Sequence, residues 1–453
     1  MKPRVARGGR TAYAVVVAAA LGFALEGDPA RAAAPSSPSP PRVAEADVGP
    51  RDVAAPVGAV VARTFEELRA LVEDAGGPPV IALTAQVYRG DLVIRRPVRV
   101  AGRHGAVLEG TGGGTVVTVK ANDVQVSDVL IRRSGHRNTT EDAGFKATGE
   151  RVRLDHARVE DTLFGVSFEE CKHCAIDAVS VRGFDEPTEL RGDGIKLWES
   201  HHSTVRRAVV ERARDVVVWY TRHATLEDLV VRGSRYGTHL MYAHDAVVRG
   251  SRFEGNVVGI FVMYSARMTL EQNFLAGARG AAGMGLGFKD SDAVVARGNW
   301  LVANTSGVYL DNTPRTSDAP VVFEGNVLAL NDVGLRLHSA AKGLSFRGND
   351  LRQNALVVEA DGGGDALAVE FRGNHFTEYE GYDLNGDGVG DVPFEVKALS
   401  SDLTESRPTL KFFQGTAAIG LLDAVAHAVP LLSSRKLLVD PAPLVRPPDI
   451  QAP

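Results

Sequence analysis

The chain has 453 residues, 44% of them hydrophobic and 48 of them glycine, so it can bury a large core, and its two cysteines exclude a small scaffold held by several disulfides. Lysine and arginine total 51 against 56 acidic residues, and this interspersed net charge of -5 gives no electrostatic case for binding DNA or RNA. Beyond the N-terminus no apolar run is long enough to cross a bilayer, which indicates a glycine-rich, β-leaning protein rather than a polytopic one.

The first 32 residues have the features of a secretory signal peptide. Basic residues precede an apolar segment from Ala12 to Leu25, and Ala30-Arg31-Ala32 follows as a cleavage site. A membrane anchor is the alternative, but the apolar segment is short and ends at Glu26. We therefore expect an exported protein with a signal peptide at 1–32 and a flexible, Pro-, Ala- and Ser-rich linker at 33–56.

The folded part is expected to begin near Val57 with a short helix and several short strands. Thr64 can cap a helix that continues to Ala75, because Glu67 stands three residues later and apolar residues follow at helical spacing. Such a helix would cover the open first turn of a repetitive fold. We expect strands at 80–83, 92–94, 98–101, 116–119 and 124–131.

A repeat of about 22 residues determines the expected fold. Glycines followed by an apolar residue recur at Gly165, Gly194, Gly237, Gly259, Gly285, Gly307 and Gly334, with Val216 in the same register. This period is too short for a propeller blade and lacks the helical halves of ankyrin or tetratricopeptide repeats. It predicts an all-β, right-handed parallel β-helix over residues 57–400.

Two sets of positions are expected inside this coil. The first and third residues after each glycine are apolar in nearly every repeat, and the same alignment places Val217 and Trp219 inside. Asparagines recur as Gly-Asn-x-x-x-x-Asn, which suits stacked corners with a structural role. The paired asparagines are Asn299 and Asn304, Asn326 and Asn331, and Asn349 and Asn354, with Asn256 and Asn273 as half-matches.

The outward positions of four successive repeats carry large apolar side chains instead of charges. The fourth position reads Trp198, Tyr220, Met241 and Met263, and the second includes His239 and Phe261. Contiguous apolar surface usually marks an interface, although a loop of the same chain could also cover it. The expected client or partner surface is Trp198, Tyr220, Phe261 and Tyr264.

Histidines next to the methionines indicate a soft metal site. His201, His223 and His244 fall at the seventh position of three consecutive repeats. Imidazole and thioether groups favour copper over hard cations, with zinc as a further option, whereas an isolated histidine on a strand is usually solvated or packed. The candidate copper ligands are His201, His223, His239, Met241, His244 and Met263.

Two other motifs have structural and metal-binding interpretations. Cys171 and Cys174 favour a local disulfide in an exported protein, and a copper(I) thiolate site is the alternative. Residues 382–391 place oxygen side chains at alternate positions, the spacing of a calcium loop, although a cluster of Asx turns fits equally well. The candidate calcium ligands are Asp383, Asn385, Asp387 and Asp391.

The C-terminal region, residues 401–453, is expected to contain an amphipathic helix between Leu410 and Leu432. It should not span a membrane, because charged residues and Pro430 interrupt it. A second cap of the coil is one role, but its apolar content favours docking on a membrane partner or on the bilayer interface. The candidate docking residues are Phe412, Phe413, Ile419, Leu422 and Val429.

Several motifs together resemble the NosD family of periplasmic nitrous oxide reductase maturation proteins, within the carbohydrate-binding and sugar-hydrolase β-helix superfamily. They are Val87-Tyr88-Arg89-Gly90, residues 236–242, Val262-Met263-Tyr264-Ser265, residues 288–291, residues 307–311 and the 381–393 loop. The resemblance covers nearly all of the mature chain and implies a non-enzymatic accessory protein. No catalytic residue is carried over, whereas His239, Met241 and Met263 lie within the motifs.

The resemblance implies a periplasmic location and association with the inner membrane through a partner, the permease of an ABC-type ATPase complex. It also implies that the protein receives copper from a small lipoprotein chaperone and assists in assembling the copper–sulfide centre of nitrous oxide reductase. The competing hypothesis is a β-helix polysaccharide lyase or glycoside hydrolase that uses Asp193, Asp290, Asp292 or Asp311. No acidic cluster repeats on adjacent turns, which disfavours it. A passive adhesion scaffold would not explain the placement of the histidines and methionines.

Overall fold

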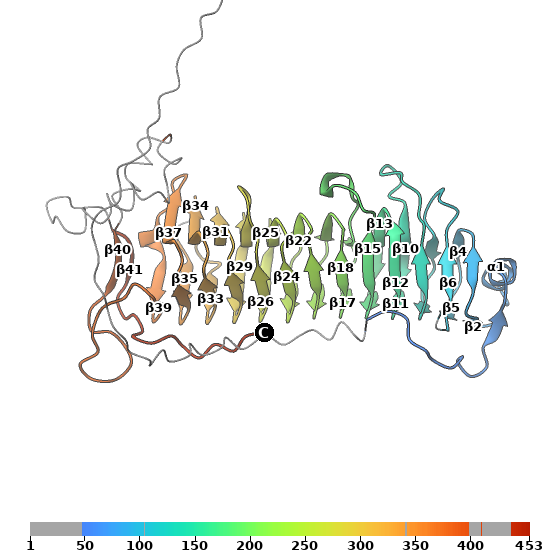
Figure 1. Cartoon of the computed structure of the whole chain (residues 1–453), viewed down its shortest axis with the longest axis horizontal. Helices are drawn as coiled ribbons and strands as arrows, with labels where there is room; N and C mark the ends of the chain where they lie inside the picture. Colours follow the sequence, from blue (N-terminus) through green and yellow to red (C-terminus); the bar gives the residue numbers. More distant parts are fainter. Residues whose placement is uncertain (1–47, 104, 340–341, 398–408, 410–435) are drawn as a thin grey trace, which may run out of the picture. The chain divides into compact units, whose positions relative to one another are not determined.

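The computed structural model describes residues 48–103, 105–339, 342–397, 409 and 436–453, and these residues form a parallel β-helix (Figure 1). Each turn gives one short strand to each of three sheets, and strands of successive turns pair in parallel. Within the described residues sheet A has 14 strands, sheet B has 13 and sheet C has 12. The expected fold class is confirmed.

The strands of sheet A are, in spatial order, β1 (Val60–Ala62), β2 (Val80–Leu83), β5 (Val98–Ala101), β8 (Val124–Ser127), β11 (Arg153–Asp155), β14 (Ala175–Asp177), β17 (Thr204–Arg206), β20 (Thr225–Glu227), β23 (Val247–Arg249), β26 (Ala266–Glu271), β29 (Asp292–Arg297), β32 (Val321–Glu324), β35 (Leu344–Arg347) and β38 (Glu370–Arg372). Those of sheet B are β3 (Val87–Arg89), β6 (Val107–Glu109), β9 (Leu130–Arg132), β12 (Arg158–Thr162), β15 (Ser180–Gly183), β18 (Val209–Glu211), β21 (Val230–Arg232), β24 (Arg252–Glu254), β27 (Phe274–Ala276), β30 (Trp300–Val302), β33 (Val327–Ala329), β36 (Asp350–Arg352) and β39 (His375–Phe376). Those of sheet C are β4 (Leu92–Ile94), β7 (Val117–Lys120), β10 (Ala143–Glu150), β13 (Phe164–Lys172), β16 (Ile195–Trp198), β19 (Asp215–Trp219), β22 (Tyr236–Met241), β25 (Val258–Met263), β28 (Met284–Lys289), β31 (Ser306–Asp311), β34 (Val333–His338) and β37 (Leu356–Asp361).

The expected N-terminal helix is present as α1 (Phe65–Glu73), at the N-terminal end of the coil (Figure 1). The side chain of Thr64 accepts a hydrogen bond from the backbone N–H of Glu67, and the Glu67 carboxylate accepts one from the N–H of Arg63. Leu68 and Val72 are buried in the core, so the apolar face of the helix covers the first turn. The early strands also match, except that residues 124–131 form β8 and β9, separated by a corner at Asp128 with φ 58°.

The interior of the coil is apolar, as the repeat predicts, but one turn was aligned wrongly by one residue. Ile195 pairs with Val216 and Leu197 pairs with Val218, so Val216 and Val218 point inward. Val217 and Trp219, which the alignment placed inside, therefore lie on the outer face. This turn lacks the glycine that marks the register elsewhere, and β19 has a pairing irregularity between Asp215 and Val217.

The asparagine stacks are confirmed as buried corner ladders. Inside a ladder, as at Asn326, the amide oxygen accepts hydrogen bonds from the preceding asparagine, and the amide nitrogen donates to a backbone carbonyl and to the next asparagine. One ladder is Asn273, Asn299, Asn326, Asn349 and Asn374, and the other is Asn304, Asn331 and Asn354. The first ladder ends on the carboxylate of Asp440, which is fully buried.

The C-terminal end of the coil is closed by an antiparallel pair of strands, β40 (Phe394–Lys397) and β41 (Lys436–Asp440). Short 3-10 turns occur at Thr188–Leu190 and Ala366–Ala368. After β41 the chain runs back beside sheet B, where Leu444 pairs with His375 and the indole N–H of Trp300 donates to the carbonyl of Gln451. Two residues of the expected linker also contact the coil. The N–H of Gly49 donates to the carbonyl of Ala178, and Arg51 forms an ion pair with Asp128.

Several expectations concern residues outside the described ranges. They are the signal peptide at 1–32, the first part of the linker, and the docking residues Phe412, Phe413, Ile419, Leu422 and Val429. In the part of the chain that the structure describes, no helix is long and apolar enough to span a bilayer.

Candidate functional site

Charged columns distinguish the outer faces of sheets A and B from that of sheet C. On sheet B, basic and acidic residues alternate from turn to turn as Arg89, Glu109, Arg132, Glu160, Arg182, Glu211, Arg232 and Glu254. On sheet A they alternate as Asp177, Arg206, Glu227, Arg249, Glu271, Arg297, Glu324 and Arg347. Opposite charges that lie directly across a strand pair neutralise each other. Over these turns the charges of the two faces are paired with each other.

Sheet C is different in its middle four turns. Toward the N-terminus Lys146 pairs with Glu169 at 2.9 Å, and toward the C-terminus Lys289 pairs with Asp311 at 2.5 Å. Between these pairs the outer face carries aromatic, thioether and imidazole groups. We call this set the soft patch, and its members are Trp198, Trp219, Tyr236, His239, Met241, Phe261 and Met263.

The structure places the expected residues of this patch on one face, with one replacement. Trp198, Trp219, Met241 and Met263 lie in register on successive turns, so Trp219 takes the position expected for Tyr220. His239 and Phe261 form the parallel column two residues away on the same face. The patch therefore places two thioethers and one imidazole next to each other.

His239 is the centre of the soft patch. Its Nε2 atom lies 3.2 Å from the sulfur of Met263, and its ring is tilted against Tyr236 with centroids 4.7 Å apart. The side chain is 7% exposed, and this burial lowers the pKa of His239 to about 4. The imidazole is consequently neutral at neutral pH, which is the form that binds a metal.

Two buried nitrogen atoms of the patch have no hydrogen-bond partner among the described residues. They are Nδ1 of His239 and the indole Nε1 of Trp219. The two rings meet edge-on, with centroids 5.6 Å apart and planes at 89°. Unpaired buried atoms also occur elsewhere in the described coil, for example at Ser127 and Thr162, but here they lie next to soft donors.

Tyr220, Tyr242 and Tyr264 form an exposed ladder at the corner that follows β19, β22 and β25. Neighbouring rings stack with centroids 5.1 Å apart, and all three backbones are left-handed, with φ between 50° and 52°. Tyr220 and Tyr242 are 43% and 40% exposed. The expected partner surface thus consists of Trp198 and Phe261 on the sheet, and Tyr220 and Tyr264 on its rim.

The expected column of His201, His223 and His244 is wrong in register. His244 pairs with Arg222, and His201 Nδ1 accepts a hydrogen bond from the Arg222 N–H, so these two histidines flank an arginine. His223 lies at the next corner position and stacks on His202, with centroids 4.6 Å apart, and His202 in turn stacks on His173. The one-residue alignment error at Val216 explains the difference, because Arg222 occupies the position expected for His223.

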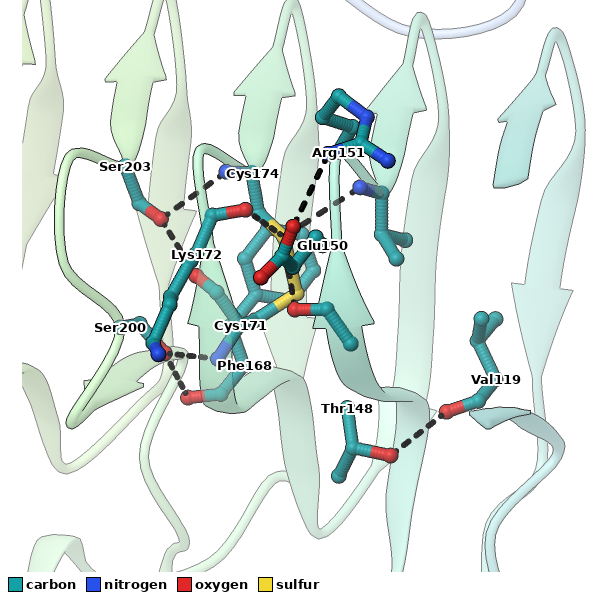
Figure 2. Close-up of a disulfide and its surroundings, with 12 residues drawn as sticks. Val119, Thr148, Glu150, Arg151, Phe168, Cys171, Lys172, Cys174, Ser200 and Ser203 are labelled. Atoms are coloured by element: carbon teal, nitrogen blue, oxygen red, sulfur yellow. Dashed lines mark hydrogen bonds and ion pairs between the residues drawn. A yellow bond between two sulfur atoms is a disulfide. The ribbon is translucent and has the colours of Figure 1, made fainter. Parts of the chain in front are cut away.

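Cys171 and Cys174 are joined by a disulfide that is buried inside the coil (Figure 2). Figure 2 also shows Ser200 and Ser203 of the next turn, whose hydroxyls accept hydrogen bonds from the N–H groups of the two cysteines. The disulfide closes a short loop, so its contribution to stability through chain entropy is about 2 kcal/mol. The arrangement agrees with the favoured disulfide, and it removes these sulfurs from the set of free thiolates.

The expected calcium loop is arranged as a cluster of Asx turns. Asp383 accepts hydrogen bonds from the N–H groups of Gly386, Asp387 and Gly388, and the bond from Gly388 contributes most to lowering the pKa of Asp383. Asn385 and Asp387 accept from backbone N–H groups two residues on, and Asp391 accepts from Leu384. These oxygens thus face the backbone of their own loop.

The acidic residues considered for sugar cleavage are held in other roles. Asp193 is 4% exposed and bound to Arg214, and burial raises the pKa of Asp193 to about 6. Asp311 pairs with Lys289, and Asp290 accepts from Asn312. Asp292 accepts from the N–H of Thr316. Nothing in these contacts forms the open pair of carboxylates that a glycosidase needs.

Over the described residues, no group of three or more His, Cys, Asp or Glu side chains is arranged to hold a metal ion. The soft patch is a different kind of donor set, because two of its three donors are thioethers. Sequence reasoning found these donors from their spacing. It missed Trp219, which the glycine alignment had placed inside the coil.

The chain is similar to known proteins along most of its coil. A family model described as "Periplasmic copper-binding protein (NosD)" matches residues 175–381. "Probable ABC transporter binding protein NosD" of Stutzerimonas stutzeri is 24% identical over 381 residues, which cover 78% of this chain and 84% of the relative. The protein of the same name from Pseudomonas aeruginosa is 25% identical over 397 residues, which cover 81% and 88%.

Solved structures show similar coils at low identity. The A-module of mannuronan C-5 epimerase AlgE6 from Azotobacter vinelandii has a TM-score of 0.44 and 13% identity, covering 70% of this chain and 91% of its own. The catalytic domain of a GH87 alpha-1,3-glucanase in complex with nigerose has a TM-score of 0.48 and 9% identity, covering 71% and 69%. Neither likeness says anything about what this chain does.

Fold and site together define a parallel β-helix protein that gathers imidazole and thioether groups on one outer face. The family match includes β22 and β25, which carry these groups, and both relatives extend over about four-fifths of the chain. Over residues 175–381 the chain is similar to the NosD family, and over about four-fifths of its length it is similar to two proteins named NosD.

Proposed function

We propose that this chain is a periplasmic accessory protein that holds copper on its soft patch, with His239, Met241 and Met263 as ligands. The observation that carries the proposal is the 3.2 Å approach of His239 Nε2 to the sulfur of Met263, where His239 is buried. The description of the family as periplasmic copper-binding proteins supports it. His201, His223 and His244 are not part of this ligand set.

The chemistry of the donors favours copper over hard cations. Neutral imidazole and thioether groups are soft ligands, and Met241 follows His239 by two residues on the same face of β22. Met263 lies in register with Met241 on the next turn. When copper is bound, these three residues would hold it against the sheet, and the aromatic walls would limit access of water. The calcium role of the 381–393 loop is not part of the proposal.

The partner surface is proposed to act in transfer of the metal. The tyrosine ladder borders the soft patch, so a protein that docks on Tyr220 and Tyr264 would lie directly beside the metal ligands. We propose that a copper chaperone lipoprotein and nitrous oxide reductase use this surface at different times, and that the chain assists assembly of the copper–sulfide centre of the reductase. In this role the chain binds and transfers, and it catalyses no reaction.

Copper binding is tested by anaerobic Cu(I) titration of the purified mature protein against a chromogenic chelator. We expect His239→Ala and Met263→Leu each to weaken binding by about 100-fold or more, because even indirect support of a metal ligand is worth ~10–100-fold. Met268→Leu and His223→Ala are matched controls, since Met268 is buried in the core and His223 lies in the exposed stack. Equal affinity of the wild type and a His239→Ala/Met263→Leu double variant would contradict the proposal.

We also propose that the chain associates peripherally with the inner membrane through the permease of an ABC-type ATPase complex. The names of both relatives, which describe probable ABC transporter binding proteins, support a transporter partner. The expected amphipathic segment between Leu410 and Leu432 contains the proposed contact residues. It is inserted between β40 and β41, which pair with each other and close the coil.

An internal deletion of residues 410–432 tests this docking role. A truncation at Ser406 would also remove β41, so it could disrupt the coil end by itself. We expect the internal deletion to fold with an unchanged thermal midpoint and to lose at least 90% of its co-purification with the permease, where roughly tenfold loss corresponds to 1.4 kcal/mol. Replacing the same residues by a Gly/Ser linker of equal length is the control for tether length. Undiminished co-purification would remove the segment from the docking role.

A further inference from the structure

The soft patch differs from most metal sites in proteins, because no unpaired negative charge among the described residues lies next to its proposed ligands. All three proposed ligands are neutral. The charged groups that act on His239 are Asp215 and Arg235, and these two form an ion pair with each other. Asp215 also accepts a hydrogen bond from the N–H of Tyr236, and Arg214 lies on its other side at 3.9 Å. Asp215 is thus already compensated by its neighbours.

A neutral, partly buried donor set discriminates between ions by charge. The cost of moving an ion out of water rises with the square of its charge, so a divalent ion pays about four times the cost of a monovalent one of equal size. Sites for divalent ions meet this cost with thiolates or carboxylates, or with several imidazoles that bind strongly as neutral ligands. The soft patch has one imidazole and two thioethers, and its carboxylate neighbour is bound to arginine.

Trp219 is placed to complete such a site. Trp219 of β19 pairs with Met241 of β22 on the outer face of sheet C, and its ring meets the imidazole of His239 edge-on. Its Nε1 atom is buried and has no hydrogen-bond partner among the described residues. An indole attracts cations through its π face without donating a lone pair, and it does so best where water is excluded.

We infer that the soft patch accepts a soft monovalent cation and rejects divalent ions, and that Trp219 is a specificity-determining residue that closes the site beside His239, Met241 and Met263. This inference rests on the proposed function of the same site, and it adds which oxidation state is held and which residue selects it. Copper would therefore be held as Cu(I), and Ag(I) is its redox-stable probe.

The indole role is tested by Ag(I) titration of the mature protein followed by tryptophan fluorescence. The chain has three tryptophans, and Trp300 lies on sheet B, where it donates to Gln451. We expect Ag(I) to change the emission of the wild type and of Trp300→Phe, and the change to fall several-fold in Trp219→Phe. Trp219→Leu should weaken Ag(I) binding by roughly 5–30-fold, the range of a desolvated cation–π contact, and Trp219→Phe by less. Unchanged Ag(I) affinity of a folded Trp219→Leu variant would overturn the indole role.

Charge selection is tested with Zn(II) and with a variant that adds a carboxylate. We expect Zn(II) to bind the wild type at least about 100-fold more weakly than Ag(I). Phe261 pairs with His239 on the next turn and is only half-buried, so Phe261→Asp adds a negative charge on the same face. This variant should gain about tenfold or more in Zn(II) affinity, whereas Phe261→Leu should not.

The outcomes separate the inference from the proposed function. Zn(II) binding as tight as Ag(I) binding, with both lost in His239→Ala, would overturn charge selection and leave a metal site in place. Failure of the wild type to bind Ag(I) or Cu(I) at all would overturn both. Circular dichroism and thermal midpoints of each variant identify any loss of affinity that comes from unfolding.

Discussion

Replacing Asn326 by alanine is expected to destabilise the protein by about 4 kcal/mol, because the change leaves several buried polar groups unpaired. The side chain of Asn326 accepts hydrogen bonds from the N–H and the amide of Asn299, each at 2.9 Å. It donates to the carbonyl of Ala296 and to the amide oxygen of Asn349, at 2.9 and 3.0 Å. Asn326 is fully buried, so bulk solvent does not reach these partners in the native coil. The measurement is the urea midpoint and slope of the mature protein.

Asn138→Ala is the matched control, because Asn138 is exposed in a turn. We expect it to change stability by less than about 0.5 kcal/mol. Hydrogen exchange would add a local test, since the Asn299 amide should lose protection in Asn326→Ala. A loss of stability no larger than that of the control would show that the ladder is not needed to hold the turns together.

Asp440→Ala is expected to release the C-terminal end of the coil. The buried carboxylate of Asp440 accepts hydrogen bonds from the N–H groups of Gly373 and Asn374, from the Asn374 amide, and from the N–H of Ala442. Losing these bonds should cost about 3 kcal/mol locally. Because each turn of a solenoid contacts only its neighbours, the loss should open the last turns before the rest.

Limited proteolysis and hydrogen exchange of residues 370–397 measure this opening. We expect at least about tenfold faster exchange in Asp440→Ala, which corresponds to a local loss of ~1.4 kcal/mol or more. Asp318→Ala is the control, because Asp318 is exposed. Asp440→Asn should be intermediate, because its amide oxygen can still accept from Asn374, whereas its NH₂ group would face the N–H groups of Gly373 and Ala442. Equal protection of the last turns in all variants would mean that β40 and β41 close the coil without Asp440.

The coil was predictable from sequence because one physical rule repeats along it. A strand sends alternate side chains inward, so a stacked interior requires apolar residues at fixed positions of every turn. Leu240, Val262 and Phe288 follow this rule, and their burial confirms it. The asparagine corners were predictable for the same reason, since each amide needs a partner on the next turn.

The candidate site was only partly predictable, because register on the outer face depends on each corner. At β19 the glycine that marks the register is replaced, so Trp219 was expected inside the coil and Tyr220 on the sheet, whereas Trp219 lies on the outer face and Tyr220 on its rim. The same one-residue shift separated His223 from His201 and His244, because Arg222 takes the position between them. His239, Met241 and Met263 escaped these errors because Gly237 and Gly259 precede them directly.

The C-terminal closure could not be read from sequence. Periodicity identifies turns that resemble each other, whereas β41 lies far along the chain from the asparagine ladder that it completes. Asp440 caps a stack of asparagines only once, so no repeating pattern in the sequence predicts its role. The path of the C-terminal segment beside sheet B was unpredictable for the same reason, because it depends on isolated contacts such as that of Trp300 with Gln451.

The alternating charges on sheets A and B have a consequence for the order in which the turns assemble during folding. If the turn that carries Glu227 were left out and the following one docked in its place, Arg206 would meet Arg249 on sheet A and Glu211 would meet Glu254 on sheet B. Like charges directly opposite each other repel, so over residues 175–254, where both columns alternate, a skipped turn is penalised on two faces at once. The charge pattern thus favours docking of each turn on its correct neighbour. The interior cannot discriminate in this way, because its apolar residues are similar in every turn.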